Sequence, residues 1–71
     1  MNEDEGEGDA LVRVRLATAQ QDHSDLDSAI HALGAMPIPD MMVISRLKRK
    51  KLLLKDEIER LKDQLTPDII A

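Results

Sequence analysis

The residues best suited to chemistry lie in one basic segment. Its five cations fall within six positions, at Arg46, Lys48, Arg49, Lys50 and Lys51. Such a cluster can bind the phosphates of a nucleic acid in a salt-dependent way. Successive residues of a helix are turned by about 100°, however, so these charges point around the helix instead of along one face. Because several acidic residues follow within 56–63, we interpret the segment as a solvated helix flank, and nucleic-acid binding by residues 46–51 is the competing function.

A row of two histidines and one aspartate is the second candidate. His23, Asp27 and His31 are four residues apart, a spacing that suggests a proton relay or a metal site. The row drifts around the helix and has no further ligand nearby, so we expect neither a metal nor a cofactor. No glycine-rich phosphate loop and no nucleophile with a plausible base accompany it, and we therefore expect that the protein is not an enzyme.

Two amphipathic stripes position these residues. Along each stripe, mostly apolar residues recur at alternating intervals of three and four, which indicates a helix. The first stripe is Val12, Leu16, Ala19, His23, Leu26, Ile30 and Leu33, and the second is Ile44, Leu47, Lys51, Leu54, Ile58, Leu61 and Leu65. We predict helices over residues 9–33 and 39–65, joined by the loop 34–38.

Residue types typical of helix ends flank both stripes. Gly34 is expected to end the first helix as a left-handed cap, and Pro37 cannot lie inside a helix. Asp40 is expected to place its carboxylate near the free amide groups at the start of the second helix. Outside the hairpin, we predict a disordered acidic tail over residues 1–8 and a C-terminal tail over residues 66–71.

The two stripes match each other when the chain folds back at the loop. Each stripe residue then faces a partner at the same distance from the loop along the sequence. The facing pairs are Val12 with Leu65, Leu16 with Leu61, Ala19 with Ile58, His23 with Leu54, Leu26 with Lys51, Ile30 with Leu47, and Leu33 with Ile44. The predicted fold is therefore all-α, an antiparallel two-helix hairpin with a coiled-coil-like seam.

Two polar residues, His23 and Lys51, interrupt the apolar seam. A polar seam residue lowers stability but rejects slipped or parallel pairings of the helices, so we interpret both residues as register-setting. Lys51 can also extend its stem over apolar surface and keep its ammonium group in water. On the flank of the seam, Asp27 is expected to lie across from Lys48.

The outer side of the second helix carries Leu52 and Leu53 close to Lys48 and Arg49. A single core in a chain this short supplies only about 3 to 5 kcal/mol, so packing against a further surface would add needed stability. We predict that these four residues contact a partner. The partner is either an unknown protein or a second copy of the chain, which would give a homodimeric four-helix bundle, and the expected function is protein–protein association through helix packing.

The composition limits the kinds of core, covalent link and location that the chain can have. The chain has no cysteine and no aromatic residue, which excludes disulfides and thiolate metal sites and requires an aliphatic core. Its apolar runs are far shorter than the ~20 residues of a membrane span, and its acidic start does not resemble a signal peptide. We therefore expect a cytoplasmic protein without a membrane partner.

The segments DHSDLDSAIHAL (22–33) and PDMMVISRLKRKKLLLKDEIERL (39–61) resemble the YdcH-like family of short bacterial proteins. The shared residues are His23, Leu26, Asp27, Ile30, the basic run 48–51, and Leu54, Lys55, Asp56, Glu57 and Ile58. The resemblance covers about forty residues and implies a bacterial, cytoplasmic helical hairpin. It implies no activity, because the function of that family is unknown, and the acidic start of this chain departs from its usual members.

Overall fold

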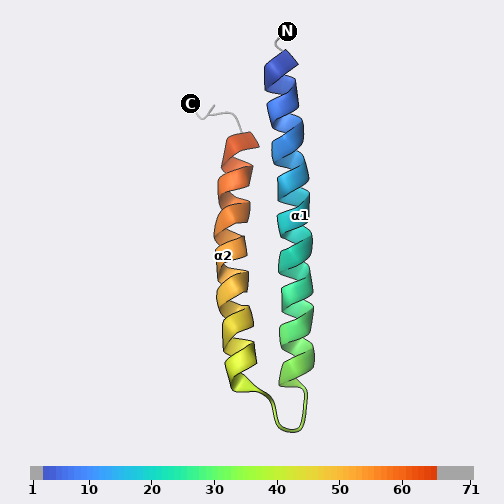
Figure 1. Cartoon of the computed structure of the whole chain (residues 1–71), viewed down its shortest axis with the longest axis vertical. Helices are drawn as coiled ribbons and strands as arrows, with labels where there is room; N and C mark the ends of the chain where they lie inside the picture. Colours follow the sequence, from blue (N-terminus) through green and yellow to red (C-terminus); the bar gives the residue numbers. More distant parts are fainter. Residues whose placement is uncertain (1–2, 66–71) are drawn as a thin grey trace.

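The computed structural model describes residues 3–65, with side chains described from Gly8 onward. Helix α1 (Glu3–Gly34) and helix α2 (Met41–Leu65) lie side by side and antiparallel, joined by a short loop at one end (Figure 1). The described part of the chain contains no strand, and the molecule is 57 Å long. The all-α antiparallel hairpin predicted from the sequence is confirmed.

The predicted seam forms the interface between the helices. Every residue of the two predicted stripes is buried or half-buried. The cluster at the centre of this interface is entirely aliphatic and consists of Val12, Leu16, Ala19, Leu54, Ile58 and Leu61. Ala19 and Ile58 are both buried in this cluster, and Ile44 is buried nearer the loop. The three-and-four spacing of the sequence therefore identified the core correctly.

Helix α1 begins earlier than predicted. We expected a disordered tail over residues 1–8 and a helix from Asp9, whereas the backbone is helical from Glu3. A helix N-terminus carries a partial positive charge that favours acidic residues in the first turn, and the sequence of residues 3–7 is EDEGE. Helix α1 therefore also covers residues 3–8, which the sequence analysis placed in the acidic tail. Residues 1–2 and the predicted C-terminal tail 66–71 lie outside the described residues.

The loop occupies residues 35–40 instead of the predicted 34–38. Gly34 is the last residue of α1 and does not adopt a positive φ, so the prediction of a left-handed cap is wrong. The last turn of the helix instead narrows, because the backbone N–H of Met36 donates to the carbonyl of Leu33, three residues back and not four, at 3.3 Å. Such bonds satisfy carbonyl groups that the helix leaves free, and Pro37 then prevents any continuation.

Asp40 caps the start of α2 as predicted. Its Oδ1 accepts hydrogen bonds from the backbone N–H groups of Met42 at 3.1 Å and Val43 at 3.2 Å. These bonds satisfy two of the amide donors that a helix leaves free at its N-terminus. Because Asp40 is the cap, α2 begins at Met41 and not at the predicted Pro39. The helix extends to Leu65, the predicted last residue.

Candidate functional site

One charged contact joins the helices near the middle of the seam. The Nζ of Lys51 donates a hydrogen bond to Oδ1 of Asp27, and both side chains are half-buried. We expected Asp27 to lie across from Lys48, whereas the lysine that it pairs with in the structure is Lys51. The stem of Lys51 lies in the seam and its ammonium group leaves the seam on the side of Asp27, so Lys51 reaches the carboxylate first.

Asp27 also has a partner on its own helix. The Nδ1 of His31 donates to the carbonyl oxygen of Asp27 at 2.9 Å and lies 4.0 Å from its Oδ1. The hydrogen bond from Lys51 holds the pKa of the Asp27 carboxyl below its ordinary value of 3.8, against a smaller opposing effect of desolvation. The positive charge of Lys51 acts on this pKa in the same direction as the hydrogen bond.

The predicted polar seam residues lie where the sequence placed them. His23 is half-buried, like Lys51, so both occupy the interface between the helices. Their register-setting role stays a prediction. Within residues 8–65, no group of three His, Asp or Glu side chains is arranged to hold a metal ion.

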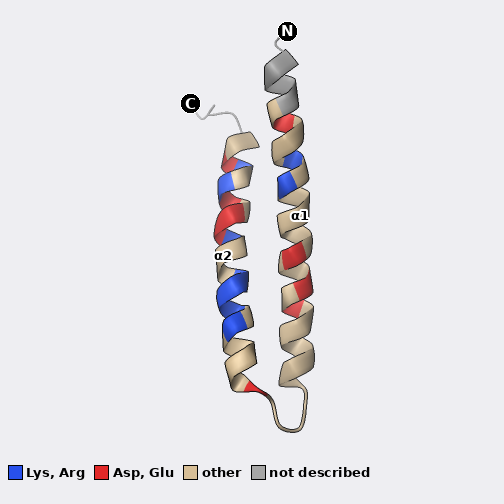
Figure 2. Ribbon diagram, in the orientation of Figure 1, with Lys and Arg blue, Asp and Glu red and all other residues tan. Residues whose placement is uncertain are grey.

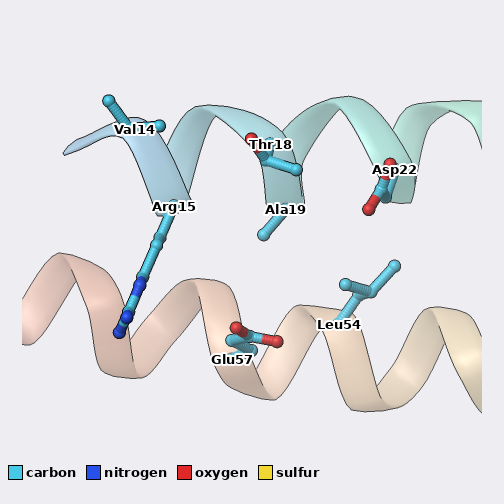
Figure 3. A pocket seen from close by; sticks show the side chains of 7 residues that line it. All are labelled: Val14, Arg15, Thr18, Ala19, Asp22, Leu54 and Glu57. Atoms are coloured by element: carbon cyan, nitrogen blue, oxygen red, sulfur yellow. The ribbon is translucent and has the colours of Figure 1, made fainter. Parts of the chain in front are cut away.

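A shallow groove follows one side of the hairpin between α1 and α2. Its apolar surface includes Val14, Leu26, Leu53 and Leu54. Charges of both signs line it, namely Arg15, Lys50 and Arg60 together with Asp22, Asp25, Asp56 and Glu57. Arg15 extends from α1 towards α2 across this surface, which we call the mixed-charge groove (Figure 3).

The other side of the hairpin carries a second groove of different character. It is lined by Gln20, His23, Lys48, Lys51, Leu52, Lys55, Ile58 and Lys62. Lys48, Lys55 and Lys62 are seven residues apart, so they lie on one side of α2 at successive pairs of helical turns. We call this surface the lysine groove. No acidic residue lines it, although Asp27 reaches Lys51 from its edge.

The structure separates the two leucines of the predicted contact surface. Leu53 lies in the mixed-charge groove with Lys50, whereas Leu52 lies in the lysine groove with Lys48. Arg49 is exposed on the outer side of α2. Leu52 and Leu53 are nearly equally exposed, at 61% and 64%, but they are turned by about 100° from each other around the helix. The four residues therefore do not form one continuous patch, although each of them is accessible to a partner.

The sequence reasoning missed an apolar surface at the loop end of the hairpin. Four large side chains there are exposed: Met36, Ile38, Met41 and Met42. We call this surface the apolar tip. A sequence signal was present, because residues 28–45 contain a single formal charge, Asp40. Figure 2 shows the same pattern, with one acidic residue at the loop end of the molecule and a basic segment on α2 next to it.

Comparison with known families gave one match. The profile of a family described as a protein of unknown function (DUF465) matches residues 16–62. This range contains both segments on which the resemblance to YdcH-like proteins rests, and it agrees that the function is unknown, but the description does not carry the YdcH-like name. The searches of curated proteins and of solved structures each gave no match.

Proposed function

The chain belongs to the family described as a protein of unknown function (DUF465), and we propose that it is a small cytoplasmic interaction module that associates with other helices. In this proposal it is not an enzyme. Its hairpin supplies a preformed helical surface, and association occurs by packing a further pair of helices against one side of the seam. The partner that the surface fits best is a second copy of the chain.

One observation carries this proposal: the hairpin leaves most of its large apolar side chains in contact with water. Among the described residues only Ala19, Ile44, Ile58 and Leu61 are buried, and no side chain is fully buried. Burial of apolar surface is the main favourable term in folding, at roughly 25 cal/mol per Å². A hairpin with so small a core gains substantial stability when a second surface covers its open side.

The charges indicate which side of the hairpin accepts a second copy. A two-fold symmetric interface brings the same patch of both copies together, so the patch must be self-complementary. The mixed-charge groove meets this requirement, because its three cations can pair with acidic residues of the other copy around a centre formed by Leu53. The lysine groove does not, since two such grooves would bring like charges together.

The test compares two neighbouring leucines of nearly equal exposure. We expect size exclusion with light scattering to give the wild-type chain a mass of twice 8.0 kDa, the mass of one chain. Leu53→Glu places a charge at the centre of the proposed interface and should reduce the mass to that of a single chain. Leu52→Glu introduces the same charge on the other side of α2 and should leave the mass unchanged.

The outcomes separate the alternatives clearly. If Leu52→Glu and not Leu53→Glu yields the monomer, association uses the lysine groove and the assignment to the mixed-charge groove is wrong. A wild-type chain that is monomeric at every concentration tested would rule out the homodimer. Circular dichroism of both variants checks that the hairpin remains helical.

A further inference from the structure

The apolar tip is the most exposed apolar surface of the described residues. Ile38 is 88% exposed at the apex of the loop, and Met42 is 73% exposed in the first turn of α2. Met36 and Met41 are exposed beside them. Isolated exposed apolar residues are common in proteins, but a contiguous cluster of them marks a contact with a partner or a membrane.

The tip carries almost no charge that would oppose entry into an apolar environment. Asp40 is the only formal charge within residues 28–45. Its carboxylate accepts hydrogen bonds from the backbone N–H groups of Met42 and Val43. The partial positive charge of the helix N-terminus therefore offsets part of the negative charge of Asp40. Proline at positions 37 and 39 further removes two backbone N–H donors from the loop.

A ring of cations surrounds α2 directly behind the tip. Arg46, Lys48, Arg49, Lys50 and Lys51 point around the helix in different directions. In the part of the chain that the structure describes, Lys51 is the one member of this ring that forms an ion pair. The acidic residues of α1 at positions 22–27 lie beside the far end of the ring, where Asp27 pairs with Lys51 and where Asp22 and Asp25 line the mixed-charge groove with Lys50. Figure 2 shows that the basic segment begins closer to the loop than these acidic residues.

From this arrangement we infer that the apolar tip docks onto an anionic lipid bilayer, with the loop inserted among the headgroups and the cation ring in contact with the lipid phosphates. The exposed cations Arg46, Lys48 and Arg49 point to different sides of α2, which suits a plane that surrounds the hairpin, whereas a groove on a protein needs charge on one face. A second copy of the tip is a poor occupant, because two cation rings would then face each other.

The distances along α2 fit this geometry. At a rise of 1.5 Å per residue, Arg46 lies about 7 Å and Lys51 about 15 Å from Met41. Amphipathic segments that lie in the membrane interface are buried by about 5–10 Å. With Met41 and Met42 at that depth, Arg46 reaches the phosphate level and the lysines extend to it from above.

The inference concerns the membrane surface only. Neither described helix is long and apolar enough to cross a bilayer, which agrees with the absence of a spanning segment in the sequence. The proposed docking departs from the expectation of no membrane partner, which rested on the absence of a spanning segment. The negative cytoplasmic leaflet attracts basic segments, so docking is compatible with a cytoplasmic protein.

The absence of aromatic residues from the chain allows a direct test. In Ile38→Trp, the introduced indole is the only aromatic fluorophore and reports on the environment of the tip. We expect its emission to shift to shorter wavelength with vesicles that contain phosphatidylglycerol, but not with vesicles of phosphatidylcholine alone. The matched control Leu11→Trp places the same reporter at an exposed position of α1 far from the loop, where its emission should stay unchanged. An unshifted Ile38→Trp spectrum with the anionic vesicles overturns the inference.

Sedimentation with the same vesicles separates insertion from simple charge attraction. Ile38→Ser combined with Met42→Ser should reduce binding at least tenfold, whereas Leu11→Ser combined with Leu52→Ser should bind like the wild type. Arg46→Gln combined with Arg49→Gln should also weaken binding, and Arg13→Gln combined with Lys55→Gln controls for the same change in net charge.

The two sets of variants give decisive outcomes. Full binding by the Ile38 and Met42 variant would mean that charge alone attracts the protein, and equal losses in both arginine and control variants would mean that the ring has no special role. Either result contradicts the inference. Circular dichroism of each variant excludes unfolding as the cause of lost binding. None of these substitutions changes Leu53, so this test and the test of self-association can fail independently.

Discussion

Among single residues, Lys51 is the clearest case of a polar side chain in the seam that forms a specific contact, because it donates a hydrogen bond to Asp27 on the other helix. The sequence indicated that Lys51 occupies a seam position, and the structure confirms its half-buried location. The identity of its partner did not follow from the sequence, because a lysine stem has several rotamers and sequence spacing does not fix which carboxylate it reaches. Because Lys51 pairs with Asp27, its ammonium group lies at the edge of the seam on the side of α1 that carries Asp27.

The lowered pKa of Asp27 predicts a pH-dependent contribution to stability. A carboxyl group whose pKa is lower in the folded than in the unfolded chain stabilises the fold above its unfolded pKa, and this contribution is lost as the pH falls through the folded pKa. Asp27→Asn should therefore lower the thermal midpoint at pH 7. The difference from the wild type should narrow when the pH falls below 3.8, the ordinary pKa of the group.

Thermal unfolding of both proteins at pH 7 and near pH 3 checks this prediction. The control is Asp63→Asn, a change at an exposed aspartate of α2. Its thermal midpoint should equal that of the wild type at both pH values. A difference between wild type and Asp27→Asn that is as large at pH 3 as at pH 7 would show that the ionised pair contributes nothing.

At the scale of the elements, the positions of both helices could be predicted because their apolar residues repeat with a helical period. The ends of the helices were harder to predict. The start of α1 was misplaced since a run of acidic residues and glycines suits both a disordered tail and the first turns of a helix. Gly34 was misread because the chain ends α1 with tightened hydrogen bonds and a following proline, which makes a left-handed residue unnecessary.

The cap of α2 gives a prediction about an element boundary. Asp40→Ala removes the acceptor of two backbone N–H groups and should lower the free energy of unfolding by about 1 kcal/mol. Chemical denaturation followed by circular dichroism measures the change. Asp63→Ala removes another exposed carboxylate, from the last turns of α2, and should have a much smaller effect. Equal losses in the two variants would argue against a capping role.

At the scale of the whole molecule, the hairpin presents three surfaces of different chemistry. One side is the mixed-charge groove, the other is the lysine groove, and the loop end is the apolar tip. The sequence predicted a contact surface but could not divide its residues between the two sides of the hairpin, because Leu52 and Leu53 are assigned to a side only when the position of the other helix is known. The tip was missed because an apolar loop has no periodic pattern.

We propose that the single hairpin is an incomplete packing unit and that a second copy covers its mixed-charge groove. Association makes unfolding depend on protein concentration by mass action. We therefore expect the thermal midpoint of the wild-type chain, followed by circular dichroism over a hundredfold range of concentration, to rise with concentration, and that of Leu53→Glu to stay constant. A wild-type midpoint that does not change over this range would contradict the claim.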